Sequence, residues 1–312
     1  MPELHVVFGA GPLGKWTARA LVNMGKSVRM VNRSGKASGL PASVEVVASD
    51  AYDLHRNIEL TRGAEVIYQC ARPRYSEWVE KFPPLQTAIL EAAAANSAKL
   101  IVGDNLYMYG RPSGILREDS PLAPNSTKGR LRAEMAQAVL EAHASGKVRA
   151  AIGRASDFFG PDDRGLTRYA ILPATQGRPV NLLGQTDLPH TYTYVADFGR
   201  LLAELGTREE ALGQVWFAPS NAPVTQAEFV DLLEAELGRS VRKRVAGAMI
   251  LRMAGLFNRD LAASVEMLFL WTNPYVVDTG KAERAFAWKA TPLRESLRQT
   301  LAWCRAVVDG QL

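Results

Sequence analysis

Residues 4–14 read LHVVFGAGPLG, and this stretch decides the fold of the chain. The apolar run Leu4–Phe8 leads into three glycines spaced as Gly-x-Gly-x-x-Gly, and a helix-like segment follows over residues 15–24. A second apolar segment, residues 27–31, completes a strand–helix–strand pattern. Glycine triplets occur by chance in loops, but a preceding strand and a following helix are the context that a dinucleotide-binding turn requires.

Each residue of this turn has a predicted task. Gly9 allows the tight turn, Gly11 lets the backbone approach a pyrophosphate, and Gly14 lets the helix pack close to the strand. Pro12 suits the first helical turn, where an N–H is not needed, and Leu13 follows it. The positive end of the helix dipole then favours phosphate. We predict that these five residues bind a dinucleotide; the alternative is a structural turn in another α/β protein.

The end of the second strand indicates which dinucleotide is bound. An NAD-selective site usually has an Asp or Glu here, which accepts hydrogen bonds from the ribose. This chain has Asn32, Arg33 and Ser34, followed two residues later by Lys36. Arginine is suited to a 2′-phosphate, because its planar fork bonds phosphate oxygens and stacks on adenine. We therefore predict NADP(H) in preference to NAD(H), unless Arg33 and Lys36 are ordinary solvated charges.

Composition excludes several classes of protein. The 312 residues are 47% hydrophobic and 22% charged, with a net charge of +5 and two cysteines. The sequence has no long Lys/Arg block and no interleaving of basic with aromatic residues, so nothing in it indicates nucleic-acid binding. No metal-ligand spacing is present. Two cysteines do not make a disulfide framework. No charged leader and no apolar run of bilayer length precede or interrupt the pattern, so we expect a cytoplasmic protein without a membrane partner.

Strands and helices alternate through the first half, which predicts an α/β fold of Rossmann type, with a doubly wound parallel sheet. Further strands are expected at 44–47, 65–70, 99–102 and 148–153. Helices are expected from Asp50, at 75–97 with a break or kink at Pro83-Pro84, and at 127–145. We assign residues 1–155, with returning segments near 190–205, to a dinucleotide-binding domain. Residues 156–312, with helices at 225–237 and 246–267, form a smaller interleaved substrate-binding lobe over the carboxyl ends of the sheet.

Several segments, in order along the chain, match one family pattern. Asp50 follows the third strand, the strand at 66–71 ends at Ala71, and Met-Tyr-Gly occupies 108–110. RASDFFGP at 154–161 and YVAD at 194–197 follow. With the glycine turn, these motifs resemble the extended short-chain dehydrogenase/reductase superfamily, also described as the NAD-dependent epimerase/dehydratase family. The resemblance implies that Asp50 contacts adenine and that Ala71 lies near the cofactor ribose.

The catalytic positions depart from that family, which uses Ser/Thr, Tyr and Lys. Lys128 stands at the Tyr position, Arg132 at the Lys position and Asn105 at the Ser position, as in an atypical branch of the superfamily. Lys128 and Arg132 share a helix face, and two adjacent cations lower the pKa of the lysine toward that of a usable acid. Lys128 would then protonate an alkoxide or bind a substrate anion; the alternative is that both are solvated charges. Tyr107 is a candidate replacement acid.

Substrate contacts are expected in the second half. Asp157 replaces the family's Asn in a segment that often touches substrate, and His190 and Tyr192 lie in a segment that faces the cleft in the family. His190 is the best histidine candidate, because His5, His55 and His143 have structural or surface settings.

Two functions remain open at this point. The first is an NADP(H)-dependent oxidoreductase or epimerase-like enzyme on a small polar carbonyl or hydroxyl substrate, with Lys128, Arg132 and Asn105 or Tyr107 in place of the usual groups. The second is a non-catalytic NAD(P)(H)-binding redox sensor, as in some members of the atypical branch. Homodimers through a helix face are common in the resembling family.

Overall fold

The computed structural model describes residues 3–310, which divide into two compact units. The first unit contains residues up to Asn105, Leu131–Arg154 and Ala196–Ala218. The second contains Leu106–Arg130, Ala155–Val195 and the chain from Pro219 onward. The segment Leu106–Arg130, which the sequence analysis grouped with the dinucleotide-binding domain, therefore belongs to the second unit.

The first unit is built on one seven-stranded sheet in which every neighbouring pair is parallel. The strand order is β10-β6-β5-β4-β1-β2-β3. The strands are β1 (Leu4–Phe8), β2 (Ser27–Asn32), β3 (Glu45–Ala48), β4 (Ala64–Gln69), β5 (Lys99–Asp104), β6 (Ala150–Arg154) and β10 (Val215–Phe217). The order reverses between β1 and β4, as in doubly wound dinucleotide-binding sheets. The predicted Rossmann-type fold is confirmed.

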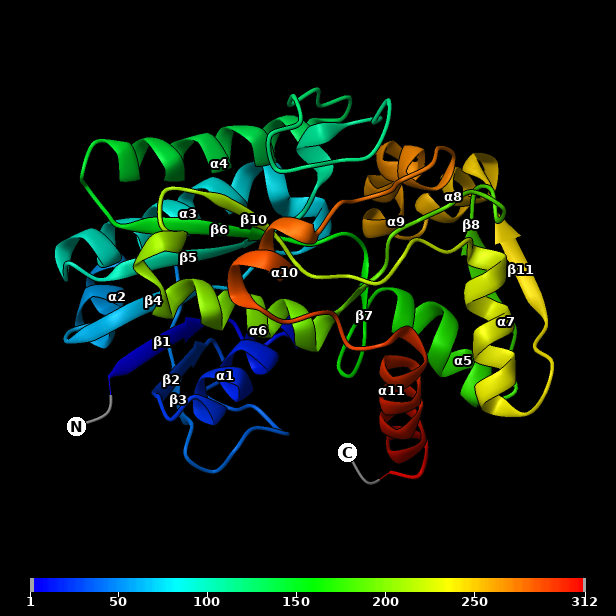
Figure 1. Ribbon diagram of the computed structural model, residues 1–312, viewed down its shortest axis with the longest axis horizontal. Coiled ribbons are helices and arrows are strands. Elements are labelled where there is room, and N and C mark those ends of the chain that lie inside the picture. The colour runs from blue at the N-terminus through cyan, green and yellow to red at the C-terminus, as the bar shows by residue number, and fades with distance from the viewer. Residues whose placement is uncertain (1–2, 311–312) are drawn as a thin grey trace. The chain divides into compact units, whose positions relative to one another are not determined.

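Helices cover both faces of this sheet, which explains why the middle residues of its central strands are buried and mostly apolar. In Figure 1, α1 (Pro12–Asn23) and α6 (Val195–Thr207) lie on one face, and α3 (Trp78–Ala95) and α4 (Thr127–Ala144) lie on the other. A shorter helix, α2 (Leu54–Leu60), packs against α3.

Two predicted features of the first unit need correction. Helix α3 is continuous through Pro83-Pro84, where a break or kink was expected, so the helix is not broken there. The two prolines leave the carbonyls of Val79 and Glu80 without a helical donor, but both residues are exposed, so water can replace the lost bonds. Helix α2 does not begin at Asp50, because Asp53 caps it by accepting a hydrogen bond from the Arg56 amide.

Neither cysteine forms a disulfide. Burial raises the pKa of the Cys70 thiol to about 12, and a hydrogen bond with Thr17 only partly opposes this. Burial likewise raises the pKa of the Cys304 thiol to about 12. Both side chains are therefore protonated thiols at neutral pH.

The second unit is more irregular and contains two short parallel sheets. One pairs β7 (Phe158–Phe159) with β9 (Thr193–Tyr194), and the other pairs β8 (Val180–Leu183) with β11 (Lys243–Ala246). Its helices are α5 (Leu172–Thr175), α7 (Gln226–Leu237), α8 (Ala248–Gly255), α9 (Arg259–Ser264), α10 (Gly280–Phe286) and α11 (Leu293–Val308). Helix α11 contacts both α5 and α7.

The helix expected over 246–267 is divided. Helix α8 ends at Gly255, and Asn258 caps α9 by accepting from the amides of Asp260 and Leu261. A Cβ at Gly255 would lie 2.9 Å from the Ala262 Cα, so only glycine allows the two helices to approach so closely. Gly255 and Asn258 were the sequence signals for this turn.

Candidate functional site

The glycine turn between β1 and α1 has three different packing environments. Gly9 has a φ of +105°, and a Cβ there would lie 2.7 Å from the Ala71 Cα. A Cβ at Gly14 would lie 1.9 Å from the Gly9 carbonyl oxygen. A Cβ at Gly11, in contrast, would meet nothing within 4 Å. The turn is thus closed by Gly9 and Gly14, and open at Gly11.

The helix that follows this turn begins without a side-chain cap. Gly11 is the N-cap residue, and Pro12 occupies the first turn, where its missing N–H costs no hydrogen bond. Leu13 packs on β5, because its Cδ2 lies 2.7 Å from the position that a Cβ of Gly103 would take. The open space at Gly11 and the uncapped helix end fit a dinucleotide pyrophosphate.

The loop after β2 is ordered by its own side chains. The Asn32 side-chain oxygen accepts from the amides of Ser34 and Gly35, both at 2.9 Å, and from the Ser34 hydroxyl at 2.8 Å. Asn32 and Ser34 therefore hold the loop together, while the side chains of Arg33 and Lys36 are exposed. No carboxylate occupies the end of β2.

Asp50, which the resemblance assigns to adenine, is exposed beyond β3. Its carboxylate accepts from the Tyr52 amide at 3.2 Å. This hydrogen bond holds the turn before α2 and leaves the carboxylate accessible.

Asp104, at the end of β5, lies between two arginines inside the first unit. Its Oδ1 accepts from Arg132 of α4, with Nε at 2.8 Å and a second, shorter bond from Nη2. Its Oδ2 accepts from Arg154 Nε at 3.1 Å. The three side chains are 1–3% exposed, and the Arg132 guanidinium also lies 4.5 Å from the centre of the Phe82 ring. Arg132 is therefore a buried structural cation, and the solvated alternative is wrong for it.

Lys128, at the start of α4, is buried in the second unit. Its ammonium donates to Glu266 Oε1 at 2.8 Å and to the Ala263 carbonyl at 2.9 Å. Burial by itself raises the pKa of Glu266, but hydrogen bonds from Lys128 and from the Thr127 amide hold it below its usual value. The solvated alternative is wrong for Lys128 as well, and each of the two cations has a carboxylate partner of its own.

Asn105 and Tyr107 both follow β5, and both are half-buried. The Asn105 amide donates to Asp104 Oδ1 at 2.7 Å. In the second unit, a Cβ at Gly129 would lie 2.7 Å from the Tyr107 carbonyl oxygen, so the Tyr107 backbone packs against the start of α4. The backbone of Gly129, the residue after Lys128, therefore lies against the turn that carries Tyr107.

The three predicted substrate residues lie together in the second unit. His190 Nε2 is 3.1 Å from Asp157 Oδ2, and the His190 ring stacks on Trp271 at 4.2 Å with an interplanar angle of 9°. The Tyr192 ring lies 4.9 Å from the His190 ring. Burial raises the pKa of the Tyr192 hydroxyl, and the Asp157 carboxylate raises it further. Sequence reasoning missed Trp271, because it lies far from His190 along the chain.

The same holds for Glu266, which pairs with Lys128 across 138 positions of sequence. Arg154 was visible in the sequence as part of a motif, but neither it nor Asp104 was expected to pair with Arg132.

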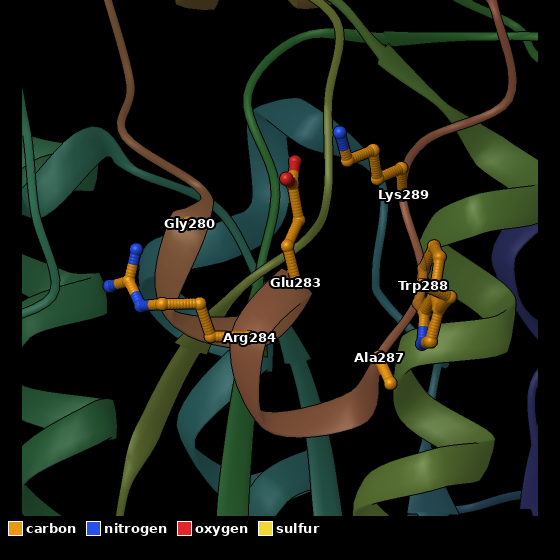
Figure 2. Close-up of a pocket in the computed structure, with 6 residues that line it drawn as sticks. All are labelled: Gly280, Glu283, Arg284, Ala287, Trp288 and Lys289. Carbon is orange, nitrogen blue, oxygen red and sulfur yellow. The ribbon is translucent and has the colours of Figure 1, made fainter.

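A hollow of about 380 Å³ on the second unit lies away from these residues. It is formed around α10 by Gly280, Glu283, Arg284, Ala287, Trp288 and Lys289. Figure 2 shows Glu283 and Lys289 pointing to the same side and Arg284 pointing to the other. None of the predicted site residues lines it.

Two kinds of feature were not found among residues 3–310. No three His, Cys, Asp or Glu side chains are grouped as metal ligands. No helix in the same range has the length and apolar character needed to cross a membrane.

Comparison with known proteins identifies the family. The model of the NAD dependent epimerase/dehydratase family matches residues 5–215. The chain belongs to this family. It is thus related to NAD-dependent enzymes of the epimerase and dehydratase type, and its cofactor is a nicotinamide dinucleotide. A search among curated proteins found no match.

Several solved structures share the fold over nearly the whole chain. The UDP-glucuronic acid 4-epimerase from Bacillus cereus, in complex with UDP-glucuronic acid and NAD, is 19% identical, with a TM-score of 0.78 over 97% of this chain and 99% of that one. The dTDP-glucose 4,6-dehydratase from Bacillus anthracis, in complex with NAD, is 17% identical, with a TM-score of 0.80 over 98% of each chain. An epimerase from Methanothermobacter thermautotrophicus is 15% identical, with a TM-score of 0.80 over 99% and 94%.

Proposed function

We propose that the chain is an NADP(H)-dependent oxidoreductase of the epimerase type, acting on a small polar carbonyl or hydroxyl substrate. The observation that carries this proposal is the glycine turn, in which Gly9 and Gly14 are packed tightly while Gly11 faces open space. A bound nicotinamide supplies hydride transfer. The chain's own residues must bind the dinucleotide, orient the substrate and move a proton.

NADP(H) is proposed in preference to NAD(H) because of the loop after β2. Asn32 replaces a carboxylate that would repel a 2′-phosphate, and the Arg33 side chain is exposed and able to bond one. The Bacillus cereus and Bacillus anthracis structures named above contain NAD, so the choice between NADP(H) and NAD(H) is the first experiment.

The experiment is a fluorescence titration of wild type, Arg33→Ala and Arg62→Ala with NADPH and with NADH. Arg33→Ala is expected to weaken NADPH binding about tenfold or more, because a charge-assisted hydrogen bond to the 2′-phosphate is lost. NADH has no 2′-phosphate, so its binding should be unchanged. Arg62 is an exposed arginine beyond α2 and serves as the matched control. Equal losses for both cofactors would remove Arg33 from the 2′-phosphate, and no binding of either would contradict the whole proposal.

Lys128 is the proposed proton donor. It is buried at the position of the family's Tyr, and Glu266 and the Ala263 carbonyl fix the direction of its ammonium. Arg132 is a proposed positioning residue that stays bound to Asp104. If its side chain turned away, the buried Asp104 carboxylate would keep only Arg154 as a partner. Asn105 and Tyr107 are the proposed assisting groups, and Asp157, His190 and Tyr192 the proposed substrate contacts.

Replacement of Lys128 tests this role. Lys128→Met is expected to lower turnover about a hundredfold or more, the usual contribution of a positioned acid, with NADPH affinity unchanged. Turnover is followed by the change in nicotinamide absorbance, NADPH with carbonyl compounds and NADP⁺ with hydroxyl compounds, and by chromatography of the products where an epimerisation leaves the cofactor unchanged. The panel includes sugar nucleotides, the class bound in the Bacillus cereus structure. Lys81→Met, at an exposed lysine of α3, is the control. Activity that survives in Lys128→Met, or a collapse of cofactor affinity, would contradict the assignment.

The second candidate is a redox sensor that binds NADP(H) without catalysis. It is favoured by the carboxylate partners that Lys128 and Arg132 each have. A sensor binds NADPH tightly and turns over no member of the panel, and Lys128→Met then changes neither property.

A further inference from the structure

Helix α8 and the turn after it expose large apolar side chains. The exposed fractions are 74% for Met249, 50% for Ile250, 55% for Met253, 81% for Leu256 and 93% for Phe257. Soluble proteins leave single apolar residues exposed without consequence, but a contiguous group of this size marks an interaction site. We call these five residues the apolar face of α8.

Their spacing follows one side of a helix. Positions 249, 250, 253, 256 and 257 are separated by one, four, seven and eight residues from the first, which is the period of an amphipathic helix. In a helix that packs on a core, this side would be buried. Here it faces solvent, and Leu251 is the one residue of α8 that is buried.

Cations surround the apolar face. Between residues 239 and 259 the chain has six basic side chains and no acidic one: Arg239, Arg242, Lys243, Arg244, Arg252 and Arg259. The chain as a whole has a net charge of +5, so everything outside this segment sums to −1. Strand β11, which carries two of these cations, contacts α8 (Figure 1), and its Val245 is 47% exposed.

Two of these cations have protein partners, since Lys243 pairs with Asp231 at 3.1 Å and Arg239 donates to two carbonyls. For Arg242, Arg244, Arg252 and Arg259 there is no carboxylate within ion-pair distance among residues 3–310. Their charge is therefore available to a partner.

We propose that the apolar face of α8 and its surrounding cations dock on an anionic lipid surface. Apolar side chains enter the boundary between headgroups and acyl chains, while arginines at the same level bind lipid phosphates. A second copy of the chain is disfavoured, because two such surfaces would bring four arginines without a carboxylate partner against four others. Nucleic acid offers the charge but no apolar phase for Leu256 and Phe257. The contact is peripheral, so it needs no spanning helix.

This proposal departs from the sequence expectation of no membrane partner, which rested on the absence of a long apolar run. A surface contact has a different signature, a short helix with an apolar side next to clustered cations.

Flotation of the full chain with vesicles tests the proposal. The vesicles contain phosphatidylcholine alone, or phosphatidylcholine with about 30% phosphatidylserine. We expect flotation with the anionic vesicles only, weakening as salt is raised. The double variants Leu256→Ser with Phe257→Ser, and Arg244→Glu with Arg252→Glu, are expected to lower the floated fraction about tenfold or more.

Matched controls separate this surface from the rest of the molecule. Val79→Ser with Ile115→Ser removes two exposed apolar side chains elsewhere, and Arg62→Glu with Arg111→Glu reverses two exposed charges elsewhere. Both controls should float like wild type.

Three results would overturn the proposal. The first is no flotation with anionic vesicles at low salt, which would leave the face to an acidic protein. The second is flotation that the patch variants and the controls reduce equally. The third is a dimer that Leu256→Ser with Phe257→Ser converts to a monomer, measured by light scattering, without vesicle binding.

Discussion

At the scale of single residues, the three glycines of the first turn differ in what a methyl group would do to them. The Gly9 carbonyl oxygen occupies the space that a Cβ of Gly14 would need, so any side chain at position 14 must displace the backbone. Gly11 has an ordinary φ of −76° and open space around it, so the fold itself does not require glycine there. Only a ligand that approaches the backbone requires it.

Gly11→Ala and Gly14→Ala should therefore separate folding from binding. Gly11→Ala is expected to change the free energy of unfolding by no more than about 1 kcal/mol, the size of an N-cap effect, while dinucleotide affinity falls about tenfold or more. Gly14→Ala should lower both stability and affinity. Chemical denaturation and NADPH titration measure the two properties. Unchanged affinity in Gly11→Ala would mean that the phosphates do not approach this turn.

The sequence was sufficient for residues whose role is set locally and insufficient for residues paired over long distances. The tasks of Gly9 and Gly14 follow from a turn of six residues, and the structure bears out the packing expected of them. Lys128 and Arg132 were assigned to one helix face, but their partners Glu266 and Asp104 depend on chain segments that no local pattern connects.

At the scale of elements, the Asp104 carboxylate joins the ends of two strands to a helix. It accepts from Arg154 of β6 and from Arg132 of α4, in a setting where water is excluded. A buried ion pair contributes little relative to an apolar replacement, but removing one partner is costly, since the other charges stay buried.

Asp104→Asn is accordingly expected to destabilise the chain by about 3–5 kcal/mol, because it leaves two buried guanidiniums without a counter-charge. Asp187→Asn, at an exposed aspartate, is the control and should cost less than about 0.5 kcal/mol. Denaturant titration gives both values. A loss for Asp104→Asn no larger than that for the control would show that the arginines are not held by this charge.

Element boundaries also show where local rules are overridden. Helix α3 continues through two prolines because the affected carbonyls face water and the residues on either side pack in the core. The segment 246–267 is rich in helix-forming residues, yet Gly255 and the Asn258 cap divide it. The apolar periodicity of a segment alone predicts neither outcome.

At the scale of the whole molecule, stability is expected to depend on one buried histidine of the first unit. His5 of β1 is fully buried, with its Nδ1 2.9 Å from the Tyr68 hydroxyl. Burial and the charge of Lys26 lower the pKa of His5 to about 4, and the Glu3 carboxylate offsets this only in part. In the unfolded chain the same imidazole has a pKa of about 6.5.

Between pH 6.5 and pH 4 the unfolded chain therefore binds a proton that the folded chain does not. Stability rises with pH wherever the unfolded state binds more protons, so it is complete above pH 6.5 and is lost as the pH falls toward 4. About 2 kcal/mol should be lost between pH 8 and pH 5, before most carboxylates titrate. His5→Gln keeps a donor for Tyr68 but cannot titrate, and its stability should be nearly flat over this range. His55→Gln, at an exposed histidine of α2, should keep the wild-type slope. Denaturant titration at the two pH values decides: a His5→Gln slope equal to that of wild type would assign the acid sensitivity to other groups.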